Sequence, residues 1–313
     1  MKKALMFGTG SSATHLINNL PNDRVYLAAV DNDTARHGKV FFDMPIIPPE
    51  QIGDYDFDEI VIGSYWEGTI KKQLIEDFNI PESKIFTPNK KYFKNDVENQ
   101  HPFRDPATLG LARNLVKTIC GNACKENVPL HIDYGTLLGI VRENDLIEWD
   151  DDVDLAADVI HAQSVQDFLL RTVSKIDDRV DWHIRRDIDQ NGRIIFFSLT
   201  FQAKEGYHFK PFATSIAMKG VEDGKAVKLK SFGAWFTPAH HLHDLDSLLW
   251  EDTRIFVPNN YDGYLKFTYG DWHTPKQDVS IGTGANWQCV PIEVIKNSTF
   301  TSEVIYGSDQ TDA

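Results

Sequence analysis

The chain has 313 residues, of which 42% are hydrophobic and 25% charged, a composition typical of soluble globular proteins rather than of disordered or fibrous ones. Its formal net charge of −14 argues against nucleic-acid binding and against docking on anionic lipid by charge alone, although peripheral membrane association stays open. No stretch reaches the ~18 consecutive apolar residues of a membrane span, and the apolar run after Met1 is too short for a signal peptide, so we expect a cytoplasmic protein.

The first ninety residues consist of short apolar runs that alternate with helical patterns. This alternation predicts a parallel sheet with helical crossovers, and we therefore expect a small Rossmann-like domain over residues 1–90. The predicted strands are 2–8, 25–31, 55–64 and 83–88, and the predicted helices are 14–20 and 71–79.

A glycine-rich turn follows the first predicted strand. Gly8, Gly10 and Ser11 lie in the string GTGSSA, which resembles the Gly-x-Gly-x-x-Ala form of the dinucleotide fingerprint, and Asp31 comes about twenty residues later. Read literally, this pattern predicts NAD binding. The unit is only half of a full dinucleotide fold, however, so a bound nucleotide or sugar-nucleotide, or a role as scaffold, acceptor-docking or oligomerisation module, stays open.

The polar segment 91–105 is predicted to be a linker, because it has no apolar period and is rich in charged residues and asparagine. Asp105 and Pro106 are typical of an N-cap and a first helical residue, so a helix is expected to begin there and to run to about Asn127. We expect a second, α+β domain with a mixed sheet over 106–290, and a C-terminal tail, 291–313, whose last dozen residues fray. After the first helix its predicted strands are 128–135, 152–158, 182–188, 193–203, 207–218 and 225–232, and its further helices are 136–143 and 163–176.

The segment WDDDVDL, 149–155, carries the strongest chemical signal. On a strand, Asp152 and Asp154 project from the same face, Asp150 has the same parity, and Val153 and Leu155 point into the core. Carboxylates gathered on one side repel one another unless a cation lies between them, and their oxygens suit Mg²⁺ or Mn²⁺. The alternative is a solvated acidic strand end, which most charge runs are.

An anion-binding turn is predicted upstream of this acidic strand. The predicted strand 128–135 breaks at Gly135 and Thr136 into a helix, whose free N–H groups attract phosphate oxygens. A phosphate cradle beside a divalent cation is what a nucleotide diphosphate donor requires.

These strings resemble the signature of the LicD/fukutin family of nucleotidyltransferase-fold enzymes. The family pattern is a GTLLG turn, an arginine, and then an acidic W-D-x-D-x-D strand, here YGTLLGIVRENDLIEWDDDVDL. Downstream, FTPAHH and VPNNYDGYLKFTYGDWHTP match the family's closing segment, so the resemblance covers about 106–276.

The resemblance implies transfer of a phospho-alcohol, such as phosphocholine or phosphoribitol, from a CDP-linked donor to a sugar hydroxyl, with release of CMP. It implies that Asp152 and Asp154 ligate the metal and that Arg142 assists at the transferring phosphoryl group, unless this arginine only pairs with Asp150 or Asp151. By the same resemblance, Gly135, Thr136, Tyr269 and Asp271 contribute to donor binding or close the site. The acceptor hydroxyl also needs a base, for which Asp150 or Asp154 is the first candidate and Asp133 a weaker one.

One departure from the family concerns the third metal ligand. Many members carry a His-x-Asp on a later strand, whereas here His208 is kept and Lys210 stands in the acidic position. Such a lysine could replace the charge of a metal ion or grip a donor phosphate, and His208 could contact donor or acceptor. If this alignment is shifted, Glu205 or a later carboxylate supplies the third ligand.

The expected function is therefore that of a LicD-type phosphotransferase acting on a surface polysaccharide or its precursor, with Mg²⁺ or Mn²⁺ as cofactor. Its expected partners are a CDP-linked donor and a carbohydrate acceptor, without nucleic acid and with oligomerisation open. Two alternatives remain at this point: a catalytically impaired nucleotide- or glycan-binding protein, and an NAD-linked enzyme that acts through its N-terminal domain.

Overall fold

The computed structural model describes residues 1–93, 101–275 and 285–308, and these residues form two compact units. The first unit contains the described residues of Met1–Val97 together with Cys289–Asn297. The second contains the described residues of Glu98–Pro275, Ala285–Gln288 and the described residues from Ser298 onward. In these described parts, no helix combines the length and the apolar character needed to cross a bilayer.

The first unit is built on a six-stranded sheet with the order β3-β4-β2-β1-β5-β6. All neighbouring strands are parallel except β3, which forms an antiparallel hairpin with β4. The strands are β1 (Lys2–Phe7), β2 (Arg24–Val30), β3 (Val40–Phe41), β4 (Met44–Ile47), β5 (Glu59–Ile62) and β6 (Ile85–Phe86). This parallel sheet confirms the fold class predicted for the N-terminal region.

Helices cover both faces of this sheet, because alternate residues of β1 point to opposite sides. Ala4 and Met6 pack with the residues of α1 (Ser11–Asn19), while Leu5 and Phe7 pack in a second cluster with α2 (Glu67–Glu76). This is the doubly wound arrangement of the Rossmann class. The remaining helices of the unit are α7 (Ile292–Asn297) and the short 3-10 helices η1 (Thr34–Arg36), η2 (Pro49–Asp54), η3 (Glu82–Lys84) and η4 (Lys90–Phe93).

The second unit is built on a mixed sheet with the order β14-β15-β7-β8-β11-β10-β9-β16; β12 also pairs with β11, and β13 pairs with β12. Strand β8 is parallel to β11 and antiparallel to β7, which mixes both pairing types at the centre of the sheet. The strands are β7 (His131–Ile132), β8 (Asp152–Asp158), β9 (Val180–Asp189), β10 (Ile194–Ala203), β11 (Ala213–Glu222), β12 (Lys225–Lys228), β13 (Phe236–Pro238), β14 (Asp246–Trp250), β15 (Thr253–Val257) and β16 (Phe300–Tyr306).

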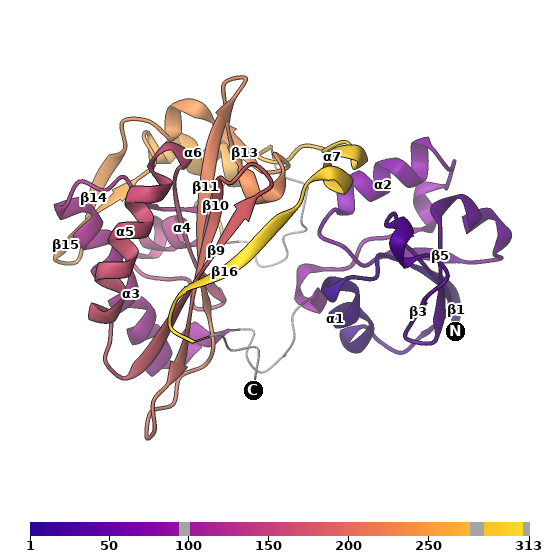
Figure 1. The fold of residues 1–313 in the computed structure, drawn as a ribbon, viewed down its shortest axis with the longest axis horizontal. Helices are drawn as coiled ribbons and strands as arrows, with labels where there is room; N and C mark the ends of the chain where they lie inside the picture. The colour runs from indigo at the N-terminus through magenta and orange to yellow at the C-terminus, as the bar shows by residue number, and fades with distance from the viewer. Residues whose placement is uncertain (94–100, 276–284, 309–313) are drawn as a thin grey trace. The chain divides into compact units, whose positions relative to one another are not determined.

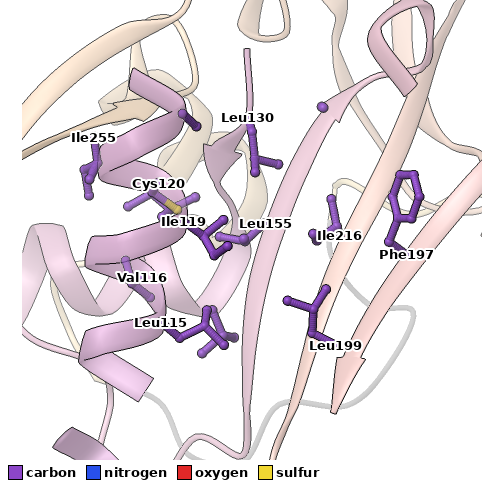
Figure 2. Packing of buried hydrophobic residues seen from close by; sticks show 14 of the residues in the cluster. Leu115, Val116, Ile119, Cys120, Leu130, Leu155, Phe197, Leu199, Ile216 and Ile255 are labelled. Carbon is purple, nitrogen blue, oxygen red and sulfur yellow. The ribbon is translucent and has the colours of Figure 1, made fainter. Parts of the chain in front are cut away.

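Helix α3 (Pro106–Lys125) begins as predicted, because Asp105 accepts a hydrogen bond from the Thr108 N–H and Pro106 occupies the first helical position. Together with α5 (Ala162–Thr172), it packs on one face of the sheet (Figure 1). Figure 2 shows the resulting core, in which Leu115 and Ile119 of α3 face Leu155 of β8. The remaining helices are α4 (Tyr134–Glu143), α6 (Tyr261–Tyr269), η5 (Pro102–Arg104), η6 (Val159–His161), η7 (Val173–Lys175), η8 (Leu229–Ser231) and η9 (Ala239–His241).

Two sequence expectations about this unit are wrong. The strand predicted over 207–218 begins only at Ala213, so 207–212 is a loop that contains His208 and Lys210. Residues 302–306, part of the last dozen that were expected to fray, instead belong to β16, which pairs antiparallel with β9 from Phe300 to Tyr306, while 309–313 lie outside the described residues. Most side chains of β16 are exposed, which explains why its sequence shows no apolar period.

Candidate active site

Three consecutive carboxylates gather where the chain enters β8. Asp150, Asp151 and Asp152 each offer an oxygen, and these atoms lie within 4.8 Å of one another. The turn is held by the Asp150 N–H, which donates to the Ile147 carbonyl at 3.0 Å, and by the Asp151 N–H, which donates to the Asp150 carboxylate at 3.1 Å. Since β8 begins only at Asp152, Asp150 and Asp151 do not follow strand alternation.

The alternation predicted for β8 itself is confirmed. Val153 and Leu155 are fully buried in the core beneath α3 and α5, while Asp152 and Asp154 are half-buried and lie on the opposite face. Burial and the neighbouring charge of Asp152 raise the pKa of Asp154 well above its usual range, and Lys228 opposes this shift. Asp154 is thus the next carboxylate along the strand, outside the three-carboxylate group of the described residues.

Gly135 lies directly against the acidic turn. It is the second residue of α4, and a Cβ atom at this position would collide with a carboxylate oxygen of Asp150. Its glycine therefore allows the start of α4 to approach Asp150 closely. Thr136 has a structural contact, because its hydroxyl accepts a hydrogen bond of 2.8 Å from the Asp154 N–H. Both residues fix the position of β8 relative to α4.

A buried ion pair lies behind this turn. The Lys219 ammonium is 2.7 Å from the Asp133 carboxylate, and both side chains are almost completely buried. The Tyr264 hydroxyl of α6 donates a hydrogen bond to the same carboxylate. Burial alone would raise the pKa of Asp133, but the adjacent Lys219 charge and the Tyr264 hydrogen bond hold it below its usual value. Asp133 is therefore an ionised structural group, which weakens its candidacy as the base.

Two tyrosines, Tyr134 and Tyr269, lie in the field of the carboxylates. The Tyr134 ring lies 5.4 Å from the Lys219 ammonium and 5.7 Å from that of Lys228. Tyr134 has φ +37°, an uncommon value for a non-glycine residue, and such backbone strain often occurs at functional sites. Burial, followed by the negative charges of Asp154 and Asp150, raises the pKa of Tyr269 well above its usual value. Its hydroxyl thus lies in the field of Asp154 and Asp150, and its closing role stays a prediction.

Arg142 contacts groups other than the acidic turn. Its guanidinium donates to the Glu143 carboxylate at 2.6 Å and to the Trp272 carbonyl at 3.3 Å. Neither of the ion pairs considered from the sequence, with Asp150 or Asp151, is formed. The arginine connects α4 to the segment after α6, where Asp271 is exposed and accepts a hydrogen bond from Thr274.

The residues expected at the third metal position lie elsewhere. In the loop before β11, His208 and Glu205 are exposed, and the Lys210 N–H donates to the Thr108 hydroxyl of α3 at 2.9 Å. The residue of β11 that pairs with Asp154 is Ser215. Lys210 thus precedes β11 by three residues, and the role of its side chain stays a prediction.

The glycine turn of the first unit has the predicted position at the end of β1. Gly8 has φ +107°, and Gly10 precedes Ser11, the first residue of α1. The Asp31 carboxylate at the end of β2 accepts hydrogen bonds from the N–H and hydroxyl of Thr9. Arg36 also donates to the Thr9 hydroxyl at 2.9 Å. Asp31 therefore braces the turn, and ligand binding there stays a prediction.

The chemistry of the acidic turn fits a divalent cation. Carboxylate oxygens are the ligands that Mg²⁺ and Mn²⁺ prefer, and three of them converge within one short segment. Asp150 and Asp152 were anticipated from strand parity. Asp151 was not among the predicted site residues, because that parity was extended to residues that precede the strand. The run of three aspartates was the signal that could have indicated it.

Helix α4 begins beside the acidic turn, which its second residue, Gly135, contacts, and the domain has a mixed sheet. This arrangement is consistent with a nucleotidyltransferase-type domain. Residues 127–260 match the family model described as LicD/FKTN/FKRP, nucleotidyltransferase domain. This part of the chain belongs to that family, as the sequence resemblance predicted. The matched residues lie within the predicted range of 106–276 and do not include Tyr269 and Asp271. Residues 1–86 match a second model, described as C2185-like, N-terminal.

None of the curated proteins compared with the chain matches it. Among solved structures, UDP-D-quinovosamine 4-dehydrogenase from Vibrio fischeri is 22% identical over 29% of this chain and 80% of that chain, with a TM-score of 0.23. The lincosamide antibiotic adenylyltransferase LnuA, bound to lincomycin, is 13% identical over 48% of this chain and 82% of that chain, with a TM-score of 0.27. At these values neither likeness assigns a function.

Proposed function

We propose that the protein is a metal-dependent transferase that moves a phospho-alcohol from a CDP-linked donor to a sugar hydroxyl of a surface polysaccharide or its precursor. The observation that carries this proposal is the group of Asp150, Asp151 and Asp152 beside Gly135, within a domain of the LicD/FKTN/FKRP family. The three cysteines are free, which supports placing the activity in the reducing cytoplasm.

In the proposed step, the acceptor oxygen forms a bond to the phosphorus that bears the alcohol. The bond between this phosphorus and the bridging oxygen of the diphosphate breaks, and CMP leaves with that oxygen. Asp154 takes the proton of the acceptor hydroxyl, because it is the carboxylate next to the three-residue group but outside it. A divalent cation held by Asp150, Asp151 and Asp152 would neutralise charge on the diphosphate.

The chain's own residues mainly position and enclose the reactants, which is most of what phosphoryl transfer requires of a protein. Gly135 keeps the start of α4 close to the acidic turn, and the Thr136 hydroxyl fixes the backbone of Asp154. Tyr269 of α6, whose hydroxyl lies in the field of Asp154 and Asp150, would close the site, and Arg142 holds the segment that follows this helix.

The proposal predicts CMP release from a panel of CDP-linked alcohols in the presence of Mg²⁺ and a glycan acceptor. Asp152→Ala should lower turnover by a factor of about 10² or more, the usual effect of losing one electrostatic contact to the transition state. The matched control is Asp181→Ala, which removes an exposed carboxylate of β9 and should leave turnover unchanged.

Two results would contradict this function. Near-normal turnover of the Asp152→Ala variant would remove the metal assignment. Donor binding that is independent of Mg²⁺, without CMP release over any donor and acceptor, would instead identify a nucleotide-binding protein.

A further inference from the structure

The neighbour of Asp154 on β11 cannot ligate a metal as a carboxylate does. Strands β8 and β11 are parallel, and their register pairs Asp152 with Ala213 and Asp154 with Ser215. From Ala213 to Val221 the sequence of β11 contains no acidic residue. Asp133, another acidic group near this face, is already paired with Lys219 and Tyr264. The carboxylates are therefore gathered at the start of β8, and the side toward β11 lacks one.

A lysine occupies this face instead. Strand β12 runs antiparallel to β11, and Lys228 is directly opposite Lys219 in the register. Directly opposite residues of an antiparallel pair project from the same face of the sheet. Lys219 pairs with Asp158 of β8, which has the parity of Asp154, so Lys228 projects from the face that carries the catalytic carboxylates.

The ring of Tyr134 connects Lys228 to the acidic turn. Its centroid is 5.7 Å from the Lys228 ammonium, and Tyr134 precedes Gly135, the residue in contact with Asp150. The Lys228 ammonium also lies 6.0 Å from the Phe196 ring. Such aromatic faces hold a cation in place without neutralising it.

The two lysines on this face differ in their availability. Lys219 is buried and paired with Asp133 at 2.7 Å. Lys228 is half-buried, and it forms no ion pair within 4.0 Å with any of the residues that the structure describes. Its positive charge can therefore interact with an anionic ligand that binds beside Asp154.

We propose that Lys228 supplies the second positive charge of the site, so that the carboxylates hold a single divalent cation and the lysine binds the diphosphate group of the donor. This inference rests on the proposed function and specifies how its donor is recognised. A second metal ion would require a carboxylate on β11, where the chain has Ser215. An ammonium is a point charge suited to phosphate oxygens, and it lies where that ion's charge would be needed.

The first experiment measures metal stoichiometry without any turnover. The full chain is titrated with Mn²⁺, and free Mn²⁺ is followed by electron paramagnetic resonance. We expect one Mn²⁺ per chain, which Asp152→Ala abolishes and Lys228→Met keeps. Two Mn²⁺ ions per chain in the unaltered protein would overturn the inference.

The second experiment measures the affinity for CDP and for inorganic pyrophosphate by calorimetry, with and without Mn²⁺. Lys228→Met should weaken both ligands by about tenfold or more, the usual effect of losing a charge-assisted hydrogen bond to phosphate. The matched control is Lys225→Met on the same strand, whose ammonium contacts Gln288 at 2.5 Å and which has the opposite parity. It should bind both ligands as the unaltered chain does.

The outcomes separate this inference from the proposed function. If the unaltered chain binds Mn²⁺ and CDP, and Lys228→Met binds CDP equally well, only the role of Lys228 is overturned. If the unaltered chain binds neither Mn²⁺ nor CDP, the proposed function fails together with it. Equal losses in Lys228→Met and Lys225→Met would show a general effect of charge and would also overturn the role of Lys228.

Discussion

Position 135 requires glycine for a reason other than its place in helix α4. Glycine in a helix normally destabilises it relative to alanine, yet here the missing Cβ makes room for the Asp150 carboxylate. The same glycine was predicted from the sequence to admit a donor phosphate. Contact with Asp150 is a separate reason for glycine, and it links the geometry of α4 to that of the three-carboxylate group.

Gly135→Ala should therefore displace Asp150 and weaken Mn²⁺ binding by about tenfold or more, since one of three charged ligands is lost. The measurement is a Mn²⁺ titration together with urea unfolding. Gly110→Ala is the matched control. Gly110 lies in α3, and a Cβ atom at this position would meet no atom within 4 Å. This control should raise the free energy of unfolding by roughly 0.5–1 kcal/mol and leave Mn²⁺ affinity unchanged. Unchanged Mn²⁺ affinity in Gly135→Ala would contradict the role of this contact.

His131 makes the stability of the protein depend on pH. Burial lowers its pKa to about 3, and neither ring nitrogen has a hydrogen-bond partner among the described residues. The folded protein therefore keeps this histidine neutral, while the unfolded chain binds a proton near pH 6.5. The contribution to stability is complete above pH 6.5 and is lost as the pH falls toward 3.

Between pH 7 and pH 5, the free energy of unfolding should accordingly fall by about 2 kcal/mol through His131 alone. Urea unfolding at several pH values measures this change. In His131→Leu the decrease over the same range should be smaller by that amount. Equal slopes for the two proteins would show that His131 is protonated in the folded state. The range stops at pH 5 so that Asp133, whose pKa is also below its usual value, stays ionised.

At the scale of elements, β16 completes the sheet of the second unit at the edge formed by β9. The two strands share six register pairs, and Ser302 donates a hydrogen bond of 2.7 Å to the buried carboxylate of Asp187. Glu303 pairs with Arg186 at 2.8 Å. Without β16, the backbone groups along this side of β9 lose their partners.

Removal of residues 299–313 should therefore lower the free energy of unfolding by roughly 1–5 kcal/mol, the sum expected for these cross-strand pairs. Chemical denaturation of the truncated chain measures the loss. Glu303→Ala, which keeps the strand and removes one exposed ion pair, should cost less than about 1 kcal/mol. A truncated chain as stable as the full one would indicate that β16 contributes nothing to the sheet.

An element could be predicted from the sequence where its apolar residues recur with the period of a helix or a strand. Strand β8 alternates between acidic and apolar residues, so its face toward the core was predicted correctly. Helix α3 has both a capping residue and an apolar stripe, so its start was predicted to the residue. Strand β16 has neither signal, since most of its residues are exposed at an edge, and it was therefore missed.

At the scale of the whole molecule, the two-part α/β architecture and the family of the second unit were predictable, because they rest on local motifs. The residue that lies beside Asp154 at the third metal position was not predictable. Whether Ser215 or Lys210 lies beside Asp154 depends on the register between β8 and β11, which is set by packing between strands distant in sequence. Strand periodicity is the same for every register, so it could not identify Ser215.

The order in which the chain builds its two units has a consequence for synthesis. Residues Cys289–Asn297 belong to the first unit, where the Val290 carbonyl accepts a hydrogen bond of 3.2 Å from the Thr69 hydroxyl. The chain then returns to the second unit as β16. The first unit therefore has all its described parts only once Asn297 has been synthesised, and the second unit only once β16 has followed. The segment 289–306 thus completes both units.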